Sequence, residues 1–184
     1  AQLGCYGSEI ATPTIDGLAR DGVQFTNFHV TPLCSPTRAC LLTGRNHHSV
    51  GMGTVPELST SAPGYDCVRP DDMATLPRIL SGNGYLTGAF GKMHQTPMWE
   101  VGETGPFDRW PTGSGFDKFY GFIGGETNQW EPALVNNNDF TEQPRSPEEG
   151  YHLSEDLTDR AITYIQDLKT ATPDKPFFLY LAYG

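Results

Sequence analysis

Apolar residues along the chain fall into blocks that are separated by polar loops rich in glycine and proline. In the first block, Thr12 and Pro13 mark the start of a predicted helix that ends near Gly22, because proline suits the first helical turn and glycine suits a helix end. The segment 23–30, VQFTNFHV, follows at once and has the β-branched and aromatic composition of a strand. We therefore expect a helix and then a strand within the first 30 residues.

A second helix is predicted directly after this strand. Ser35 is the expected N-cap, Pro36 the first helical residue and Gly44 the residue that ends the helix. This assignment places Cys34 just outside the helix N-terminus, where unpaired backbone N–H groups create a positive field.

Two further blocks repeat the order of helix and then strand. The segments 52–74 and 95–150, which flank the second block, are rich in glycine, proline, asparagine and acidic residues and indicate long loops. The predicted elements are a helix over 75–84, a strand over 85–91, a helix that Ser154 caps, and an apolar strand over 176–183.

The alternation of helices with nearly continuous apolar strands predicts the α/β class, with a mainly parallel sheet sandwiched by helices. In such a sheet, ligands bind beyond the carboxyl ends of the strands. Cys34 follows one predicted strand, and the pair Lys92 and His94 follows another. We expect these two stretches to meet in one site.

Composition and charge narrow the class of partner. The 184 residues carry a formal net charge of −10, which argues against binding to nucleic acid because that binding needs clustered Lys and Arg. Apolar runs such as 176–184 are far shorter than the ~20 residues that a membrane-spanning helix requires, so no span is predicted in this segment. The four cysteines are too widely spaced for a disulfide scaffold and include no C-x-x-C pair of a zinc site.

Four side chains carry candidate chemistry. Cys34 at the predicted helix start, with Arg38 one turn later, lies in a positive field that stabilises an anion, either a thiolate nucleophile or a bound tetrahedral oxyanion. Lys92 and His94, two positions apart on an extended segment, are expected to point the same way and to offer a fixed positive charge and a proton donor. The combination suggests hydrolysis of a charged ester; the alternative is that these are ordinary solvent-exposed side chains.

Two short motifs resemble those of one family. C-S-P-T-R at 34–38 fits the C-x-P-x-R signature of type I sulfatases, and GKMHQTP at 91–97 resembles the second signature of the same family, usually G-K-W-H. Over most of residues 4–55 and 75–97, and again near its end, the chain resembles the arylsulfatases of the alkaline phosphatase-like superfamily. The resemblance implies an alkaline phosphatase/sulfatase-like fold and the hydrolysis of sulfuric esters.

The resemblance also implies a role for each of the four side chains. In sulfatases a maturation enzyme oxidises the signature cysteine, here Cys34, to formylglycine, whose hydrate attacks the sulfur of a sulfate ester. Arg38 would hold this hydrate and Lys92 would bind a sulfate oxygen, while His94 would bond to the hydrate or assist in regenerating the aldehyde. The implied partners are this formylglycine-generating enzyme and a sulfate ester, either a small molecule or a glycan.

Calcium is the metal that the resemblance implies, held by oxygen ligands that include the formylglycine at residue 34. The sequence departs from the family pattern here, because it lacks the early acidic pair, and Asp71 and Asp72 lie in a loop instead. The later Asp-Asn metal pair and a further lysine are also missing. We therefore expect residues 1–184 to be an incomplete part of a single sulfatase catalytic domain, inactive alone, with its remaining metal ligands outside the chain. The cellular location stays open.

Two further residues are candidates for contact with substrate. His48 follows the signature helix, and Trp130 lies in an amide-rich loop over 124–138, where its ring offers a stacking surface for the organic part of an ester. The competing functions are a phosphonate monoester or phosphodiester hydrolase of the same superfamily, a non-catalytic anion-binding homologue, and a thiol hydrolase or redox protein that uses Cys34 directly.

Overall fold

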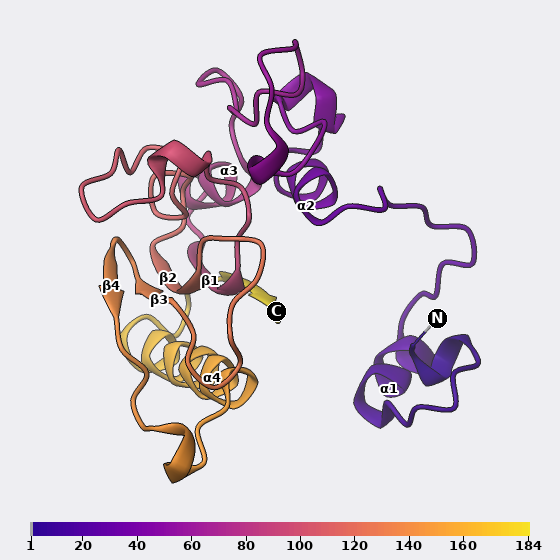
Figure 1. Cartoon of the computed structure of the whole chain (residues 1–184). Helices are drawn as coiled ribbons and strands as arrows, with labels where there is room; N and C mark the ends of the chain where they lie inside the picture. The colour runs from indigo at the N-terminus through magenta and orange to yellow at the C-terminus, as the bar shows by residue number, and fades with distance from the viewer. Residues whose placement is uncertain (1) are drawn as a thin grey trace. The chain divides into compact units, whose positions relative to one another are not determined.

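The computed structural model describes residues 2–184, which divide into two compact units (Figure 1). The first unit ends at Val30 and the second spans Thr31–Gly184. The whole sheet and every candidate site residue belong to the second unit. No helix among the described residues has the length and apolar character that crossing a membrane requires.

The first unit contains a short 3-10 helix, η1 (Gly4–Tyr6), and the predicted helix α1 (Pro13–Asp21). Thr12 occupies the N-cap position of α1 as expected, but its hydroxyl donates to Asp16 Oδ1 (2.9 Å) and caps no backbone N–H of the helix. The same Asp16 oxygen accepts from the backbone N–H of Cys5 (2.7 Å), so this carboxylate ties the two helices together.

The predicted strand over 23–30 does not form. Its residues have no ladder partner within residues 2–184, and Val23, Phe25 and Phe28 are exposed. An isolated extended segment gains neither ladder hydrogen bonds nor a buried face, so β-branched and aromatic residues alone do not make it a strand. The prediction was therefore wrong.

A mixed sheet forms the centre of the second unit, with the strand order β4-β3-β2-β1-β5 (Figure 1). Three strands run parallel and form the predicted mainly parallel part, namely β1 (Leu86–Lys92), β2 (Lys118–Phe122) and β5 (Phe177–Ala182). Two short antiparallel strands extend the sheet beyond β2, namely β3 (Leu134–Asn136) and β4 (Asp139–Thr141).

The strands β2, β3 and β4 lie within the stretch 95–150, where the sequence predicts only a long loop. That prediction was wrong because β2, with the sequence KFYGF, is short and buried on both faces. Such a strand lacks the alternation of apolar and polar residues that marks a half-buried strand. The strands β3 and β4 have three residues each and depend on β2 as their neighbour.

The helices of this unit form close to the predicted positions. The α-helices are α2 (Cys34–Thr43), α3 (Leu76–Gly82) and α4 (Leu153–Ala171). The short 3-10 helices are η2 (His47–Val50), η3 (Pro56–Leu58), η4 (Met98–Glu100) and η5 (Pro147–Glu149). Gly44 ends α2 in the left-handed region, with φ of 66°, as its position predicts.

Helices cover both faces of the sheet, as predicted. On one face Leu42 of α2 packs in a cluster with Ala89 and Phe119, and α3 lies against β1. On the other face Leu157 of α4 packs in a cluster with Phe90. Successive residues of β1 therefore point into two separate cores, as the alternation of side chains along a strand requires.

The helix α2 begins two residues earlier than predicted. Leu33, not Ser35, is its N-cap residue, so Cys34 is the first residue of the helix rather than lying just outside it. Pro36 then falls in the first turn, where its missing N–H removes no intrahelical hydrogen bond. Pro36 is compatible with a helix that begins at either residue, so the sequence alone did not place the start of α2 correctly.

The helix α4 also begins two residues earlier than predicted. Its N-cap is His152, whose Nδ1 accepts a hydrogen bond from the backbone N–H of Ser154 (3.2 Å), the residue predicted to cap. Because an imidazole nitrogen accepts this bond, the hydroxyl of Ser154 is not needed as the cap. The acidic first turn, with Glu155 and Asp156, is confirmed.

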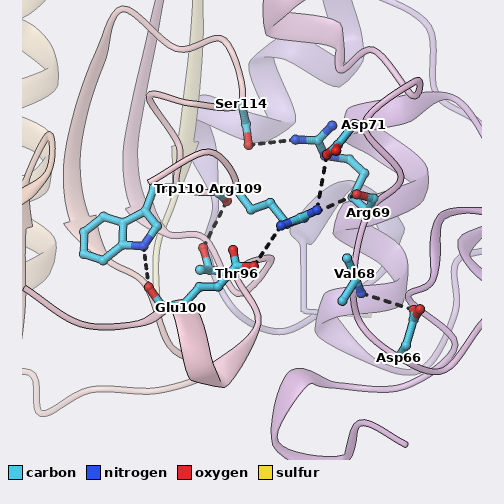
Figure 2. Close-up of polar contacts among 9 residues, drawn as sticks. All are labelled: Asp66, Val68, Arg69, Asp71, Thr96, Glu100, Arg109, Trp110 and Ser114. Carbon is cyan, nitrogen blue, oxygen red and sulfur yellow. Dashed lines mark hydrogen bonds and ion pairs between the residues drawn. The ribbon is translucent and has the colours of Figure 1, made fainter. Parts of the chain in front are cut away.

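A polar network around Arg109 fixes the loops near the end of β1 (Figure 2). Its guanidinium pairs with Glu100 Oε1 through Nη1 (2.8 Å) and with Asp71 Oδ1 through Nη2 (3.2 Å). The backbone carbonyl of Arg109 accepts from the Thr96 hydroxyl (3.1 Å), and Trp110 Nε1 donates to the Glu100 carbonyl (2.8 Å). The segment that leaves β1 is thereby tied to the loop that carries Asp71.

Candidate active site

The two stretches that carry the sequence motifs meet at the carboxyl end of β1. Cys34 is the first residue of α2, and His94 follows the last residue of β1, Lys92, by two positions. Although they lie 60 residues apart in the sequence, Cys34 Sγ is 2.9 Å from Nδ1 of His94. The expectation that these stretches share one place in the fold is met in this geometry.

The His94 ring is held by both backbone and neighbours. His94 has a left-handed backbone, with φ of 52°, and its N–H donates to the carbonyl of Ile123 (2.9 Å), just beyond β2. The His94 side chain is 5% exposed, and its Nε2 lies 2.8 Å from Oε2 of Glu57 on η3. A left-handed residue ends the regular strand, so the simple alternation expected between Lys92 and His94 does not describe this segment.

Arg38 lies one turn after Cys34 and is anchored to the sheet. Its Nη1 donates to the carbonyl oxygen of Lys92 (2.7 Å) and to the hydroxyl of Tyr180 on β5 (3.0 Å). These bonds join α2 to the end of β1 and to the middle of β5. The guanidinium is therefore fixed beside the first turn of α2, where positive charge adds to the field of the helix.

Burial is the main reason that the pKa of His94 lies below its ordinary value. Burial lowers the pKa of His94, the hydrogen bond and charge of Glu57 oppose this, and the positive charges of Lys92 and Arg38 lower the pKa further; the net direction is down. For Glu57, partial burial raises the pKa, but the hydrogen bond to His94 and the charge of Lys92 bring it below its ordinary value. The site thus pairs a carboxylate and an imidazole, both with lowered pKa values, beside the positive charges of Lys92 and Arg38.

The fold adds three residues that sequence reasoning missed. Glu57 contacts His94, Tyr180 contacts Arg38, and Gln95 Nε2 donates to the carbonyl of Ser35 (2.9 Å) in the first turn of α2. Glu57 and Tyr180 belong to no local motif, because they reach the site from η3 and from β5, whereas Gln95 lies within the motif at 91–97. Only the position of Gln95 directly after His94 offered a signal.

The two candidates for substrate contact lie against other residues. His48 Nε2 is 3.0 Å from the hydroxyl of Tyr65, and the Trp130 ring meets the His152 ring edge to face, with centroids 5.5 Å apart. A role of His48 and Trp130 in binding substrate stays a prediction.

A metal site is not complete within residues 2–184. No three His, Cys, Asp or Glu side chains of this part of the chain are grouped in a way that would hold a metal ion. The pair Asp71 and Asp72 lies in a turn ahead of α3, and Asp71 binds Arg109 with its side chain 90% exposed.

The comparison with known families decides the class of this protein. The sequence profile of the sulfatase family matches residues 1–184. The chain belongs to the sulfatase family. This sulfatase chain is 38% identical over 141 residues to an uncharacterised sulfatase of Schizosaccharomyces pombe, a match that covers 72% of the chain and 24% of the relative.

Named arylsulfatases are similar to this sulfatase chain as well. Arylsulfatase J of Mus musculus is 34% identical over 189 residues, which covers 98% of the chain and 29% of that protein. Arylsulfatase A of Homo sapiens is 40% identical over 121 residues, which covers 65% of the chain and 22% of that protein. The chain thus spans less than a third of the length of these relatives.

Solved structures confirm the fold of the sulfatase chain. The crystal structure of Ps i-CgsB in complex with k-i-k-neocarrahexaose matches with a TM-score of 0.79 at 29% identity, over 100% of this chain and 42% of that one. The PsFucS1 sulfatase from Pseudoalteromonas sp. matches with a TM-score of 0.71 at 21% identity, over 99% of this chain and 40% of that one, which shows the fold alone. The α/β, sulfatase-like architecture is confirmed over this part of their length.

Proposed function

We propose that this chain carries the nucleophile side of a site that hydrolyses sulfate esters, within a single sulfatase catalytic domain. The observation that supports this most directly is the 2.9 Å distance between Cys34 Sγ and His94 Nδ1, because it joins the two sulfatase-like signatures in space. Membership of the sulfatase family and similarity to named arylsulfatases support the same class of reaction.

Residue 34 is proposed to act as formylglycine. The position fits this group, because Sγ is partly buried at the positive N-terminus of α2 and lies within hydrogen-bond distance of His94 Nδ1. An oxygen in this place would therefore find a partner. When present, the hydrated aldehyde supplies two hydroxyls on one carbon, one to attack sulfur and one to permit the release of sulfate.

The neighbouring side chains are proposed to manage the charge and the protons of this reaction. Arg38, held by the Lys92 carbonyl and Tyr180, neutralises negative charge at residue 34. The ammonium of Lys92 binds a sulfate oxygen, and His94 exchanges a proton with residue 34 at Nδ1. The contacts of Arg38 with the Lys92 carbonyl and of His94 with Cys34 support these roles.

Calcium does not fit the described residues as a complete site. Residues 2–184 contain no cluster of carboxylates, histidines and cysteines able to hold it. Calcium needs six to eight oxygen ligands. We propose only that residue 34, as formylglycine, would supply one of them.

The proposed substrate is a sulfate ester of a small molecule or a glycan. The similarity to Ps i-CgsB, which was crystallised with an oligosaccharide, k-i-k-neocarrahexaose, supports a glycan. Trp130, 54% exposed, and His48 remain the candidates for contact with the organic part of the ester.

Co-expression with a formylglycine-generating enzyme is expected to convert Cys34 to the aldehyde. Mass spectrometry of the tryptic peptide 21–38 measures the conversion, and Cys40 in the adjoining peptide 39–45 is an internal control that should keep its thiol. If Cys34 stays a thiol while a control sulfatase is converted in the same cells, formylglycine is contradicted, and an anion-binding homologue or a thiol hydrolase becomes the better account.

Activity is measured next on the converted full-length protein, with Cys34→Ala as the inactive control. We expect an aryl sulfate to be hydrolysed faster than a phosphate diester. The opposite order of rates would favour a phosphonate monoester or phosphodiester hydrolase of the same superfamily.

A further inference from the structure

Glu57 contacts the His94 ring on the side opposite to residue 34. Nε2 of His94 lies 3.0 Å from Oε1 and 2.8 Å from Oε2 of Glu57, while Nδ1 lies 2.9 Å from Cys34 Sγ. Both ring nitrogens are therefore engaged, each by one neighbour. The three side chains form a continuous series of contacts from the carboxylate on η3 to the proposed nucleophile position.

The loop after β2 packs closely against the side chains of Glu57 and His94. A Cβ placed on Gly125 would lie 2.7 Å from Cε1 and 2.9 Å from Nε2 of His94, and 3.3 Å from Oε1 of Glu57. Only a residue without a side chain allows the backbone to come this close. Together with the bond from the His94 N–H to the Ile123 carbonyl, this contact leaves the ring little room to turn away.

The carboxylate decides which ring nitrogen carries the proton. Both carboxylate oxygens of Glu57 lie within hydrogen-bond distance of His94 Nε2, at 3.0 and 2.8 Å, so this nitrogen faces a hydrogen-bond acceptor. An ionised carboxylate only accepts hydrogen bonds, and a neutral imidazole has one N–H and one acceptor nitrogen. The proton therefore belongs on Nε2, and the lone pair of Nδ1 faces residue 34.

We infer that Glu57 is a positioning residue that keeps the proton of His94 on Nε2 and so leaves Nδ1 free to accept a proton from residue 34. The use of this proton in catalysis rests on the proposed function. The tautomer of His94 does not, because it is a property of the chain itself. In the transfer, Nδ1 takes the proton from a hydroxyl at residue 34, and the electron pair of the broken O–H bond stays on the oxygen. The positive charge then formed on the ring lies beside the Glu57 carboxylate, which stabilises it.

Nitrogen-15 NMR of the histidine-labelled 184-residue chain tests the tautomer without any need for catalysis. The chain has five histidines, and a His94→Gln variant assigns the resonances of His94. At a pH where the ring is neutral, we expect a slowly exchanging N–H resonance that correlates with Nε2 of His94. An N–H resonance on Nδ1 instead would overturn the inference.

Three variants separate positioning from general effects on folding. Glu57→Ala is expected to lose the slowly exchanging Nε2–H resonance, and Glu57→Gln to keep it, because the amide oxygen can accept at the same place. Glu103→Ala, which removes an exposed carboxylate, is the matched control and should resemble the parent chain. Persistence of the Nε2–H resonance in Glu57→Ala, with the fold confirmed by circular dichroism, would also overturn the inference.

Kinetics of the converted full-length protein distinguish this inference from the proposed function. Glu57→Ala is expected to lower kcat by about 10²-fold with little change in KM, since a positioned proton-transfer group contributes roughly 10²–10⁴-fold. If no sulfate ester is hydrolysed but the Nε2–H resonance responds as expected, the proposed function fails and the positioning of His94 stands. If the enzyme is active and Glu57→Ala leaves kcat unchanged, the positioning role fails and the proposed function stands.

Discussion

Individual cysteines of this chain lie in contrasting surroundings. Cys34 faces His94 Nδ1 at 2.9 Å, whereas Cys67 is fully buried in a small core with Val50 and Met52. Burial, followed by the negative charge of nearby carboxylates, raises the pKa of Cys67 to about 11. Because only the thiolate is a nucleophile, Cys67 is both shielded from solvent and unreactive at neutral pH.

Cys67 is expected to resist alkylation in the folded chain. With iodoacetamide at pH 8, Cys67 should stay unmodified while the partly exposed Cys5 reacts, and both should react in concentrated urea. Peptide mass spectrometry measures each site. Equal labelling of Cys67 and Cys5 without urea would show that the small core opens readily.

The residues of the candidate site differ in how far the sequence predicts them. Cys34, Arg38 and His94 lie in short local motifs, so their types and spacing were enough to select them. Glu57 and Tyr180 contact these residues only after a loop and a distant strand have taken their places. No local pattern contains that information, because it depends on the packing of the whole sheet.

At the scale of elements, glycines let three strands approach each other where the site begins. Gly91 on β1 has φ of +105°, and a Cβ there would lie 2.0 Å from the carbonyl oxygen of Ala182 on β5. A Cβ on Gly121 of β2 would lie 2.1 Å from the carbonyl oxygen of Gly91. A side chain at either position would force apart the strand ends that position Lys92.

Gly91→Ala is expected to destabilise the chain by more than about 2 kcal/mol, since backbone strain of this kind alone costs roughly 1–3 kcal/mol. The matched control is Gly82→Ala at the end of α3, where an added Cβ meets nothing within 4 Å. That change should shift stability by no more than about 1 kcal/mol. Urea unfolding followed by circular dichroism compares the two; similar midpoints would contradict the close approach at Gly91.

The sequence predicted an element well where the residues of that element determine its structure. It predicted poorly where a neighbouring strand determines it. The helix α4 and the strands β1 and β5 have continuous apolar faces that are visible in the sequence. The segment 23–30 has strand-like composition but no partner among residues 2–184, whereas β2 has a partner on each side but no alternation of polar residues. Strand formation depends on pairing, which composition does not encode.

At the scale of the whole molecule, one buried carboxylate links the second helical layer to the sheet. Asp156 at the start of α4 is 5% exposed and accepts from the hydroxyls of Tyr120 on β2 (2.6 Å) and Tyr151 (3.0 Å). Arg160, one turn further along α4, donates to its other oxygen (3.3 Å). Loss of the carboxylate would leave two buried hydroxyls without their acceptor.

Asp156→Ala is expected to lower the free energy of unfolding by about 2–4 kcal/mol, since each buried polar group left unpaired costs roughly 1–3 kcal/mol. Asp167→Ala, an exposed position on the same helix, is the control and should change it by less than about 0.5 kcal/mol. Chemical denaturation of both variants measures the difference. If the two variants had the same free energy of unfolding, the tyrosine hydroxyls would have found other hydrogen-bond partners.

The pairing of β1 with both β2 and β5 bears on the order in which the molecule folds. β2 follows β1 closely in the sequence, whereas β5 lies far downstream, and closing the longer loop costs more entropy and proceeds more slowly. This favours early association of β1 with β2, which sets the backbone of His94 through the Ile123 carbonyl. Tyr180 reaches Arg38 only when β5 arrives. We therefore expect the imidazole side of the site to form before the Tyr180 contact completes the anchoring of Arg38.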